Sequence, residues 1–376
     1  MLTLPGKLTA DTFLKRYWQK QPLFMPGALP KIRPAITRNE LAWLATLEDV
    51  ESRLVFVDRS ARKRRYRVES GPFDPAHLQS LPKRDWTLLV HDVEKHLPAM
   101  RVLFNHVPFI PQWRIDDLMV SFAAPGGGVG PHRDNYDVFL CQGTGVRNWR
   151  FTTDAVADDR EASNDLALLS EFESADDRDA IEGDVLYLPP CAPHWGTAKR
   201  ACMTYSIGMR APQVADLLPA PGDRGDGQRF YCDPDLAVDE AVPGSISDQA
   251  SKRAQQLLGY SDDRRKDAAK ALGLFATQPK DWLEPERLDE TMANDALRRL
   301  QSGARLEVHG MALIAFDSEM IYVNGSNKVV APEALSVVSE ICATRSFSGL
   351  PTMANPVRDT LLWMLQQGAF EIAEIP

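Results

Sequence analysis

The sequence lacks the features that characterise several large classes of protein. No apolar run approaches the ~20 residues that a membrane-spanning helix needs, and the N-terminal segment contains no apolar stretch of the length found in secretory signals. The five cysteines are odd in number and show no CxxC spacing, which disfavours a disulfide framework and a zinc ribbon. We therefore expect a cytoplasmic protein with no membrane association.

Basic residues are also in the minority. The chain has 43 Lys and Arg against 52 Asp and Glu, so its formal net charge is −9, which argues against a protein that adheres as a whole to nucleic acid. One segment departs from this average, because six of the nine residues in Arg59–Arg67 are basic. A solvated hairpin is the simpler interpretation, and contact with RNA or with an RNA-bound protein is the alternative. Both stay open, and nucleic-acid contact is not predicted.

The first 210 residues contain many short strand-like segments. Apolar residues alternate with other residues along these segments, and Gly and Pro separate them. This pattern favours an antiparallel barrel or sandwich, so residues 1–210 are predicted to form a mainly β domain. The segments are Arg53–Asp58, Trp86–Val90, Asp117–Phe122, Asp137–Cys141, Asp184–Leu188 and Cys202–Met209.

The composition changes after the β domain. A run rich in Pro and Gly is typical of a linker. Ser247 can then cap a helix that continues to Leu258, and apolar residues at helical spacing predict a second helix over Asp262–Ala276. A pair of helices this short has little core of its own. We therefore predict that residues 211–283 form a helical dimerisation region and that the protein is a homodimer.

Residues 284–376 combine helices with a small meander of strands, an order typical of a winged-helix domain. The Asn324-Gly325 pair is a strong signal for a hairpin turn. The last helix carries a single positive residue, Arg358, beside Asp359, so we expect no basic recognition helix and no DNA binding. The expected helices are Asp289–Gln301, Pro332–Ala343 and Pro356–Gln367, and the expected strands are Arg305–His309, Met311–Phe316, Met320–Val323 and Phe370–Ala373.

Two of the seven histidines stand beside features that suit a metal site. His132 and Asp134 follow a glycine-rich segment, and if they lie on a strand, alternation places both side chains on one face. His194 follows a strand-like segment that ends in two prolines and a short turn. Two histidines and one carboxylate can form a facial triad that leaves positions open on non-haem Fe(II). Zinc could use the same ligands in a hydrolase, so the triad alone leaves the metal open.

A positive charge close to these residues adds to the pattern. If Val146–Phe151 is a strand, Arg147 shares one face with Trp149 and Phe151, and an inward guanidinium beside two aromatic rings needs an anionic partner. A dicarboxylate co-substrate suits the bidentate geometry of Arg. The alternatives are that Arg150 faces inward instead, or that Arg147 pairs with a structural Asp.

Several longer motifs resemble the JmjC-type 2-oxoglutarate oxygenases, and more closely their bacterial ribosomal branch, which hydroxylates an arginine of a large-subunit ribosomal protein. The motifs are FLKRYWQKQP, DDLMVSFAAPGGGVGPHRDNYDVFLCQGTG, GDVLYLPPCAPHWG, MTYSIGMRAP and FYCDPD. The resemblance covers residues 1 to about 235. It implies a double-stranded β-helix (a cupin/JmjC barrel), followed by the helical dimerisation segment and a C-terminal winged-helix domain.

Carried over position by position, the resemblance implies roles for the candidate residues. Fe(II) would be bound by His132, Asp134 and His194, with 2-oxoglutarate and dioxygen as co-substrates. The distal carboxylate of 2-oxoglutarate would be held by Arg147, helped by Ser206 or Thr204 on a neighbouring strand. Members of the family often have Asn at the position of Thr204, so the sequence departs from the pattern there.

The resemblance also implies a substrate channel. Positions that line the arginine channel in this branch are matched by Asp117, Met119 and Tyr136. Their simpler interpretation is structural, with Met119 and Tyr136 in the barrel core and Asp117 as a turn cap. A carboxylate near the metal suits a guanidinium or amide substrate, which makes Asp117 the most informative of the three.

Other functions stay open at this point. A histidyl hydroxylase of ribosomal proteins would share the same architecture, whereas a demethylase of the superfamily would be expected to carry zinc-binding cysteine patterns, which the sequence lacks. A non-catalytic cupin that senses a small acid and a zinc-dependent cupin isomerase belong to different classes. The sensor would bind 2-oxoglutarate without consuming it, and the isomerase would work without oxygen.

Overall fold

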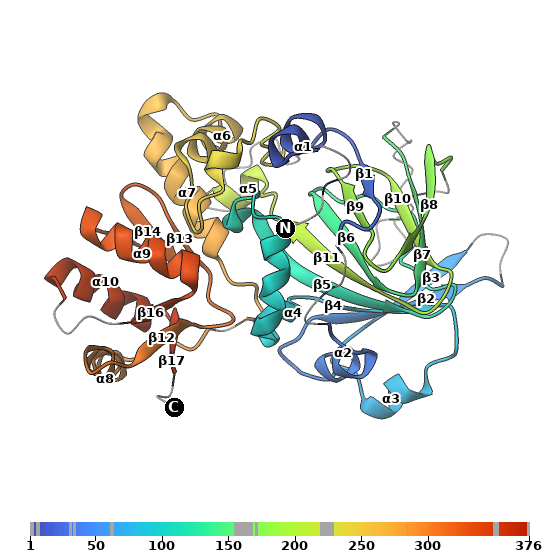
Figure 1. The fold of residues 1–376 in the computed structure, drawn as a ribbon, viewed down its shortest axis with the longest axis horizontal. Coiled ribbons are helices and arrows are strands. Elements are labelled where there is room, and N and C mark those ends of the chain that lie inside the picture. The colour runs from blue at the N-terminus through green and yellow to red at the C-terminus, as the bar shows by residue number, and fades with distance from the viewer. Residues whose placement is uncertain are drawn as a thin grey trace. The chain divides into compact units, whose positions relative to one another are not determined.

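The protein folds into two compact units (Figure 1). The computed structural model describes residues 4, 8–29, 32, 35–60, 64–153, 168–169, 172–218, 229–283, 285–348 and 353–373. The first unit comprises residues 1–108, 115–209 and 234–236, and the second comprises residues 109–114, 210–233 and 237–376. Across the described ranges, no helix is both long and apolar enough to span a membrane.

The first unit is built on two β-sheets in which neighbouring strands run antiparallel. This arrangement confirms the prediction of a mainly β domain with antiparallel strands. The larger sheet has the order β1 (Leu23–Met25), β9 (Val185–Leu188), β6 (Val138–Thr144), β11 (Cys202–Met209), β5 (Ile115–Ala123), β4 (Trp86–Val90), β2 (Ser52–Asp58) and β3 (Arg65–Ser70). The smaller sheet has the order β10 (His194–Ala198), β7 (Val146–Phe151) and β8 (Asp176–Ile181).

Apolar alternation places these strands correctly because one face of each strand must be buried. The six predicted segments correspond to β2, β4, β5, β6, β9 and β11, and their ends differ from the prediction by at most three residues. β11 lies inside the larger sheet between β6 and β5, and all of its residues are buried. β7 buries alternate residues, and Arg147 is one of them.

Short helices accompany the sheets of the first unit, and polar caps start several of them. Thr37 and Glu40 form a capping box at the start of α2. The carboxylate of Asp74 accepts a hydrogen bond from the main-chain N–H of Ala76 at the start of α3. The helices are α1 (Ala10–Arg16), α2 (Arg38–Leu44), α3 (Pro75–Ser80), α4 (Val93–His96) and a 3₁₀ segment, Pro98–His106.

The second unit combines helices with two small antiparallel sheets. The predicted helices are present, and the first three residues of Asp262–Ala276 form a 3₁₀ turn instead of α-helix. Two short strands, β15 and β16, were not predicted, because their sequences carry no clear apolar alternation. The helices are α5 (Val214–Leu217), α6 (Asp248–Leu258), α7 (Arg265–Thr277), α8 (Glu290–Gln301), α9 (Pro332–Thr344) and α10 (Asn355–Gln366). The sheets are β16 (Ser346–Ser348), β12 (Arg305–Val308) and β17 (Phe370–Ala373), and β13 (Ile314–Phe316), β14 (Met320–Val323) and β15 (Ser326–Val329).

The predicted hairpin turn at Asn324-Gly325 is confirmed between β14 and β15. Both residues have positive φ, 47° and 75°, as the tight hairpin turns require. The buried side chain of Asn324 also links this turn to its surroundings. Its Oδ1 accepts a hydrogen bond from the Leu313 N–H at 2.9 Å, and its Nδ2 donates to the carbonyl of Gln367 at 2.8 Å.

The helix pair α6 and α7 has a packing partner within the chain, which the sequence did not indicate. Its buried residues share one core with Ala315 of β13 and Tyr322 of β14. The contact is close, because a Cβ on Gly273 of α7 would lie 2.3 Å from Cζ of Tyr322. The helices therefore do not need a second copy to complete their core, and the homodimer stays a prediction.

A buried ion pair in the second unit provides a test of its stability. Arg114 and Asp233 are fully buried, with Nε to Oδ2 at 3.0 Å and Nη2 to Oδ1 at 3.2 Å. Asp233→Ala should lower the free energy of unfolding by about 3–5 kcal/mol, because the guanidinium loses its buried carboxylate. Urea denaturation measures this loss. The control, Asp295→Ala, removes an exposed pair with Arg298 and should cost less than about 1 kcal/mol; equal losses would contradict the prediction.

Candidate metal centre

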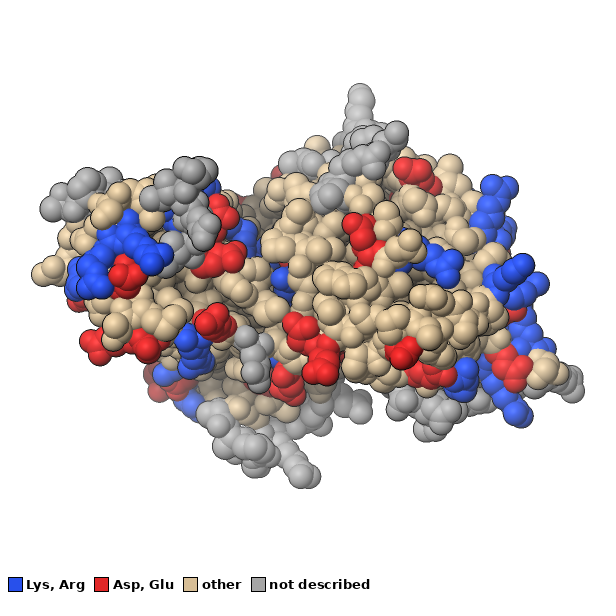
Figure 2. Space-filling view, turned by 90° about the horizontal axis from the view of Figure 1, so that it is seen from below, with Lys and Arg blue, Asp and Glu red and all other residues tan. Residues whose placement is uncertain are grey.

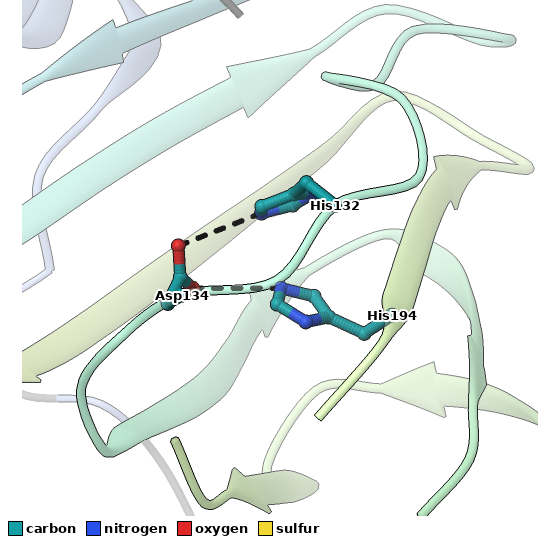
Figure 3. A group of neighbouring side chains, drawn as sticks. All are labelled: His132, Asp134 and His194. Carbon is teal, nitrogen blue, oxygen red and sulfur yellow. Dashed lines mark ion pairs between the residues drawn. The ribbon is translucent and has the colours of Figure 1, made fainter. Parts of the chain in front are cut away.

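Three side chains with metal-binding atoms meet in the first unit (Figure 3). The carboxylate of Asp134 faces both imidazoles, with Oδ1 4.0 Å from Nε2 of His132 and Oδ2 3.6 Å from Nε2 of His194. All three ligand atoms lie within 4.8 Å of one another. Ligands that stand about 2 Å from one metal ion have this kind of spacing. The structure therefore brings His132, Asp134 and His194 together, as the sequence predicts.

The two imidazoles are held in one orientation by the main chain. Nδ1 of His132 lies 3.0 Å from the carbonyl oxygen of Gly130, and Nδ1 of His194 lies 2.9 Å from that of Ala192. A carbonyl only accepts hydrogen bonds, so each Nδ1 carries a proton, and in the neutral imidazole Nε2 then keeps the lone pair that faces Asp134. This is the tautomer that a metal requires.

Burial keeps His194 in the neutral form. Its side chain is 2% exposed. Burial first, and the neighbouring His132 second, lower the pKa of His194 to about 4. The imidazole is therefore uncharged at neutral pH, and it can offer Nε2 to a cation without first losing a proton.

The backbone around the triad differs from the predicted strand. His132 does not lie on a continuous strand with Asp134; it forms an isolated antiparallel bridge with His194. The His132 N–H donates to the His194 carbonyl at 3.0 Å, and the His194 N–H donates to the His132 carbonyl at 2.9 Å. The expectation of strand alternation for this pair was therefore wrong, and the bridge, rather than alternation, brings the ligands together.

A cavity of about 330 Å³ lies beside the triad and gathers most of the predicted site residues. Charged and polar side chains from several strands of both sheets line it, together with apolar residues. A concave site with convergent polar groups is typical of a small-molecule site. Of the predicted residues, the lining contains His132, Asp134, His194, Arg147, Ser206, Asp117, Met119 and Tyr136.

Arg147 brings a buried positive charge to this cavity. It is 6% exposed, and its Nε and Nη2 have no hydrogen-bond partner in the described part of the chain. Its Cζ lies 5.4 Å from the centre of the Trp149 ring. The Trp149 ring has room on the neighbouring strand because Gly196 lies opposite it, and a Cβ on Gly196 would lie 2.5 Å from the ring. Arg150 instead stacks on Trp195, with Cζ 3.9 Å from the ring centre. The inward face of β7 is therefore the one that carries Arg147.

Ser206 and Thr204 lie differently, although they share one face of β11. Ser206 lines the cavity. Thr204 is buried, its hydroxyl donates to Oε1 of Gln142 at 3.2 Å, and it is not among the described residues that line the cavity. Of the two predicted helpers of Arg147, only Ser206 faces the cavity.

Sequence reasoning missed two further hydroxyl groups, those of Thr87 on β4 and Ser121 on β5, which both line the cavity. The Thr87 hydroxyl is buried and has no hydrogen-bond partner among the described residues. Ser121 could have been found, because strand alternation puts it on the face of Asp117 and Met119. Thr87 could not, because its place depends on how β4 pairs with β5.

Three carboxylates, those of Asp116, Asp117 and Asp134, line the cavity together with Tyr136. Tyr136 is 40% exposed, and the charge of Asp134, followed by burial and by the carboxylates of Asp117 and Asp116, raises the pKa of its phenol well above the ordinary range. The phenol therefore stays protonated and can donate a hydrogen bond. This group of carboxylates with a phenol suits a cationic substrate side chain.

The basic segment Arg59–Arg67 is engaged with its own unit at several points. Arg59 pairs with Asp85 at 2.8 Å, Arg67 pairs with Glu69, and Cζ of Arg64 lies 4.5 Å from the centre of the Trp195 ring. Figure 2 shows Lys and Arg gathered at the right-hand edge, where Figure 1 has the β2–β3 hairpin. These contacts favour the solvated hairpin over a nucleic-acid surface. Arg62 and Lys63 lie outside the described residues.

The sequence matches a known domain family and named relatives. Residues 102–217 match the JmjC domain family. The ribosomal protein uL16 3-hydroxylase of Escherichia coli K12 is 33% identical over 330 residues, which cover 85% of this chain and 85% of the relative. A probable ribosomal oxygenase of Haemophilus influenzae is 34% identical over 318 residues, which cover 81% of this chain and 72% of the relative.

Solved structures match nearly the whole chain. The X-ray structure of Escherichia coli YcfD has a TM-score of 0.76 and 29% identity, and the match covers 99% of each chain. The structure of YcfD, a ribosomal oxygenase, with cobalt and 2-oxoglutarate has a TM-score of 0.73 and 28% identity, and the match covers 98% of this chain and 99% of that one. The antiparallel sheets of the first unit are thus a JmjC/cupin fold. By sequence identity and by fold, the chain belongs to the JmjC-domain bacterial ribosomal oxygenases.

Proposed function

We propose that the protein is a 2-oxoglutarate- and Fe(II)-dependent dioxygenase that hydroxylates an arginine side chain of the large-subunit ribosomal protein uL16. The observation that carries this proposal is the buried guanidinium of Arg147, which lines the same cavity as the triad and whose Nε and Nη2 have no hydrogen-bond partner among the described residues. A buried cation needs an anion. The name of the Escherichia coli relative, uL16 3-hydroxylase, supports the choice of substrate.

The triad suits Fe(II). Two imidazole nitrogens and one carboxylate on one side of an ion leave further positions open for small ligands, which is the arrangement of the non-haem iron oxygenases. Cobalt in the YcfD structures is consistent with such a site in this family. When bound together, Fe(II) and 2-oxoglutarate allow dioxygen to hydroxylate an unactivated C–H bond, with release of succinate and carbon dioxide.

Arg147 is proposed to hold the distal carboxylate of 2-oxoglutarate. Its planar guanidinium can bind both carboxylate oxygens, and the hydroxyl groups of Ser206 and Thr87 line the same cavity. Trp149 covers the guanidinium with an apolar ring, which excludes water and strengthens the charge pairing. Thr204 is assigned a lesser part, because its hydroxyl already binds Gln142.

The substrate arginine is proposed to enter past Tyr136 towards Asp117. A carboxylate pairs with a guanidinium through charge-assisted hydrogen bonds, and Met119 provides an apolar contact for the aliphatic part of the side chain. All three residues line the cavity beside the metal ligands. A neutral histidine substrate would gain less from the Asp117 carboxylate, so the histidyl hydroxylase is the second candidate.

Mass spectrometry of reacted uL16 tests the proposal. The protein is incubated with Fe(II), 2-oxoglutarate, air and uL16. The uL16 is taken from cells that lack the enzyme, and the product is mapped by fragmentation. We expect one added oxygen on a single arginine, absent when 2-oxoglutarate is left out. An added oxygen on a histidine would indicate the sister activity. Binding of 2-oxoglutarate without any succinate would indicate a sensor.

The remaining parts of the chain carry proposals of their own. We assign residues 1–210 to the catalytic JmjC barrel, 211–283 to the linker and helical dimerisation region, and 284–376 to a winged-helix-like domain. The packing of α8, α9 and α10 around one apolar core with β12 supports a compact C-terminal domain. We propose a cytoplasmic location, because the proposed substrate is a ribosomal protein.

Removing a metal ligand should strongly weaken metal binding. Co²⁺ is a suitable probe, and isothermal titration measures its affinity. We expect His132→Ala and His194→Ala each to weaken Co²⁺ binding by about 100-fold or more, because each removes one of three ligands. The control is His77→Ala, which removes a half-exposed histidine that binds Glu69 away from the cavity and should bind Co²⁺ like the unaltered protein. Full affinity in His194→Ala would exclude the triad as the metal site.

Arg147→Leu should raise the KM for 2-oxoglutarate by about 30- to 100-fold, equivalent to about 2–3 kcal/mol, because a charged hydrogen bond to the co-substrate is lost. Succinate production at varied 2-oxoglutarate measures this change. Arg150→Leu is the matched control on the same strand, because Arg150 stacks on Trp195. Its KM should stay within about threefold of the unaltered value. A larger KM increase in Arg150→Leu than in Arg147→Leu would contradict the assignment of the co-substrate to Arg147.

Light scattering tests the proposed homodimer. The full chain should have about twice the monomer mass of 41.9 kDa. Ala271 is half-buried on α7 and packs against the edge of the helix core, so Ala271→Glu should give a monomer by placing a charge in the proposed interface. Val329→Glu, at an exposed apolar position on β15, should leave the mass unchanged. A dimer that persists in Ala271→Glu would exclude α7 as the interface.

A further inference from the structure

We infer that His91 is a positioning residue that holds the carboxylate of Asp117 in place for the substrate arginine and so sets the affinity for the protein substrate. The inference rests on the proposed function, in which Asp117 receives a guanidinium. His91 belongs to none of the motifs that identify the metal or the 2-oxoglutarate site. It comes directly after β4, on the opposite side of Asp117 from β11 in the strand order of the sheet.

The contact between the two side chains is direct. Nδ1 of His91 lies 3.0 Å from Oδ2 of Asp117, and both residues line the cavity that contains the triad. The Asp117 side chain is 9% exposed and that of His91 is 26% exposed. An ionised carboxylate only accepts hydrogen bonds, so Nδ1 of His91 is the donor. The histidine therefore restricts rotation of the carboxylate that faces the substrate.

The main chain of His91 is itself fixed. β4 pairs with β5 as far as Val90 opposite Val120, and beyond that point side chains take over the contacts to β5. The His91 N–H donates to the carbonyl of Glu51 at 2.9 Å. The buried carboxylate of Glu94 accepts a hydrogen bond from the Leu118 N–H at 2.9 Å. The segment that starts at His91 is thus anchored at the residue that follows Asp117.

The neighbouring strand leaves room on the other side of the carboxylate. Gly208 of β11 lies opposite Asp117 in the strand register. A Cβ on Gly208 would lie 3.1 Å from Oδ1 of Asp117 and 3.9 Å from Cε2 of Tyr136. The space between the carboxylate and the phenol is therefore kept by the absence of a side chain at position 208. A planar guanidinium suits a narrow space between a carboxylate and an aromatic ring.

Together these contacts give Asp117 one defined orientation. His91 binds Oδ2 from the β4 side, and Gly208 adjoins Oδ1 from the β11 side. A carboxylate that is already oriented loses less conformational freedom when the substrate binds. Removal of His91 should therefore weaken substrate binding, while the chemical step, which depends on the metal and on 2-oxoglutarate, changes less.

Steady-state hydroxylation of uL16 tests this inference. We expect His91→Leu to raise the KM for uL16 by about tenfold, with kcat changed by less than about threefold. His91→Asn keeps an N–H donor near the position of Nδ1 and should restore most of the affinity. His77→Leu is the matched control, because His77 makes a similar contact with Glu69 outside the cavity, and it should leave the KM for uL16 unchanged.

Two further measurements separate positioning from a merely structural role. In the Asp117→Asn background, His91→Leu should add little to the KM for uL16, because the carboxylate that it orients is gone. Gly208→Ala crowds the same carboxylate from the other strand and should also raise the KM for uL16. This variant tests the inference if His91→Leu does not fold. An unchanged KM in the folded His91 variants, or equal effects of His91→Leu and His91→Asn, would overturn the inference. Absence of arginine hydroxylation by the unaltered protein would instead overturn the proposed function on which it rests.

Discussion

The reciprocal main-chain hydrogen bonds between His132 and His194 are the contact on which the site depends. They join the segment before β6, in the larger sheet, to the first residue of β10, in the smaller sheet. Both imidazoles then bind main-chain carbonyls through Nδ1 and turn Nε2 towards Asp134. Main-chain hydrogen bonds therefore orient both imidazoles, which is the kind of preorganisation that a metal centre needs.

Two buried arginines differ in the partners of their guanidinium groups. Arg114 is fully buried and paired with Asp233, so its charge is satisfied by the fold. Arg147 is also buried, yet its Nε and Nη2 lack a partner in the described residues. A buried charge without a partner is costly, and such groups are concentrated at functional sites. The contrast supports the proposal that Arg147 binds a ligand, whereas Arg114 is paired within the second unit.

Side chains of both charges line the cavity. Arg147 on β7 provides a positive group, whereas Asp117 on β5 and the candidate metal ligand Asp134 provide negative ones. In the proposed function, the anionic co-substrate pairs with Arg147 and the cationic side chain of the protein substrate pairs with Asp117. Tyr136 remains a neutral donor at the opening, because the surrounding carboxylates raise the pKa of its phenol.

The sequence by itself determined many of the elements and the candidate residues of the site. Alternation located six strands of the first unit and a cap at Ser247 located the start of α6, whereas alternation along β7 left open whether Arg147 or Arg150 faces inward. Only the tertiary structure decided the His132–His194 bridge, the pairing of Thr204 with Gln142, the exposure of Thr87 to the cavity, and the packing of Gly273 on Tyr322. The physical reason is range: periodicity and capping act within a few residues, whereas strand register and close packing join segments that are distant in the chain and leave no local signal.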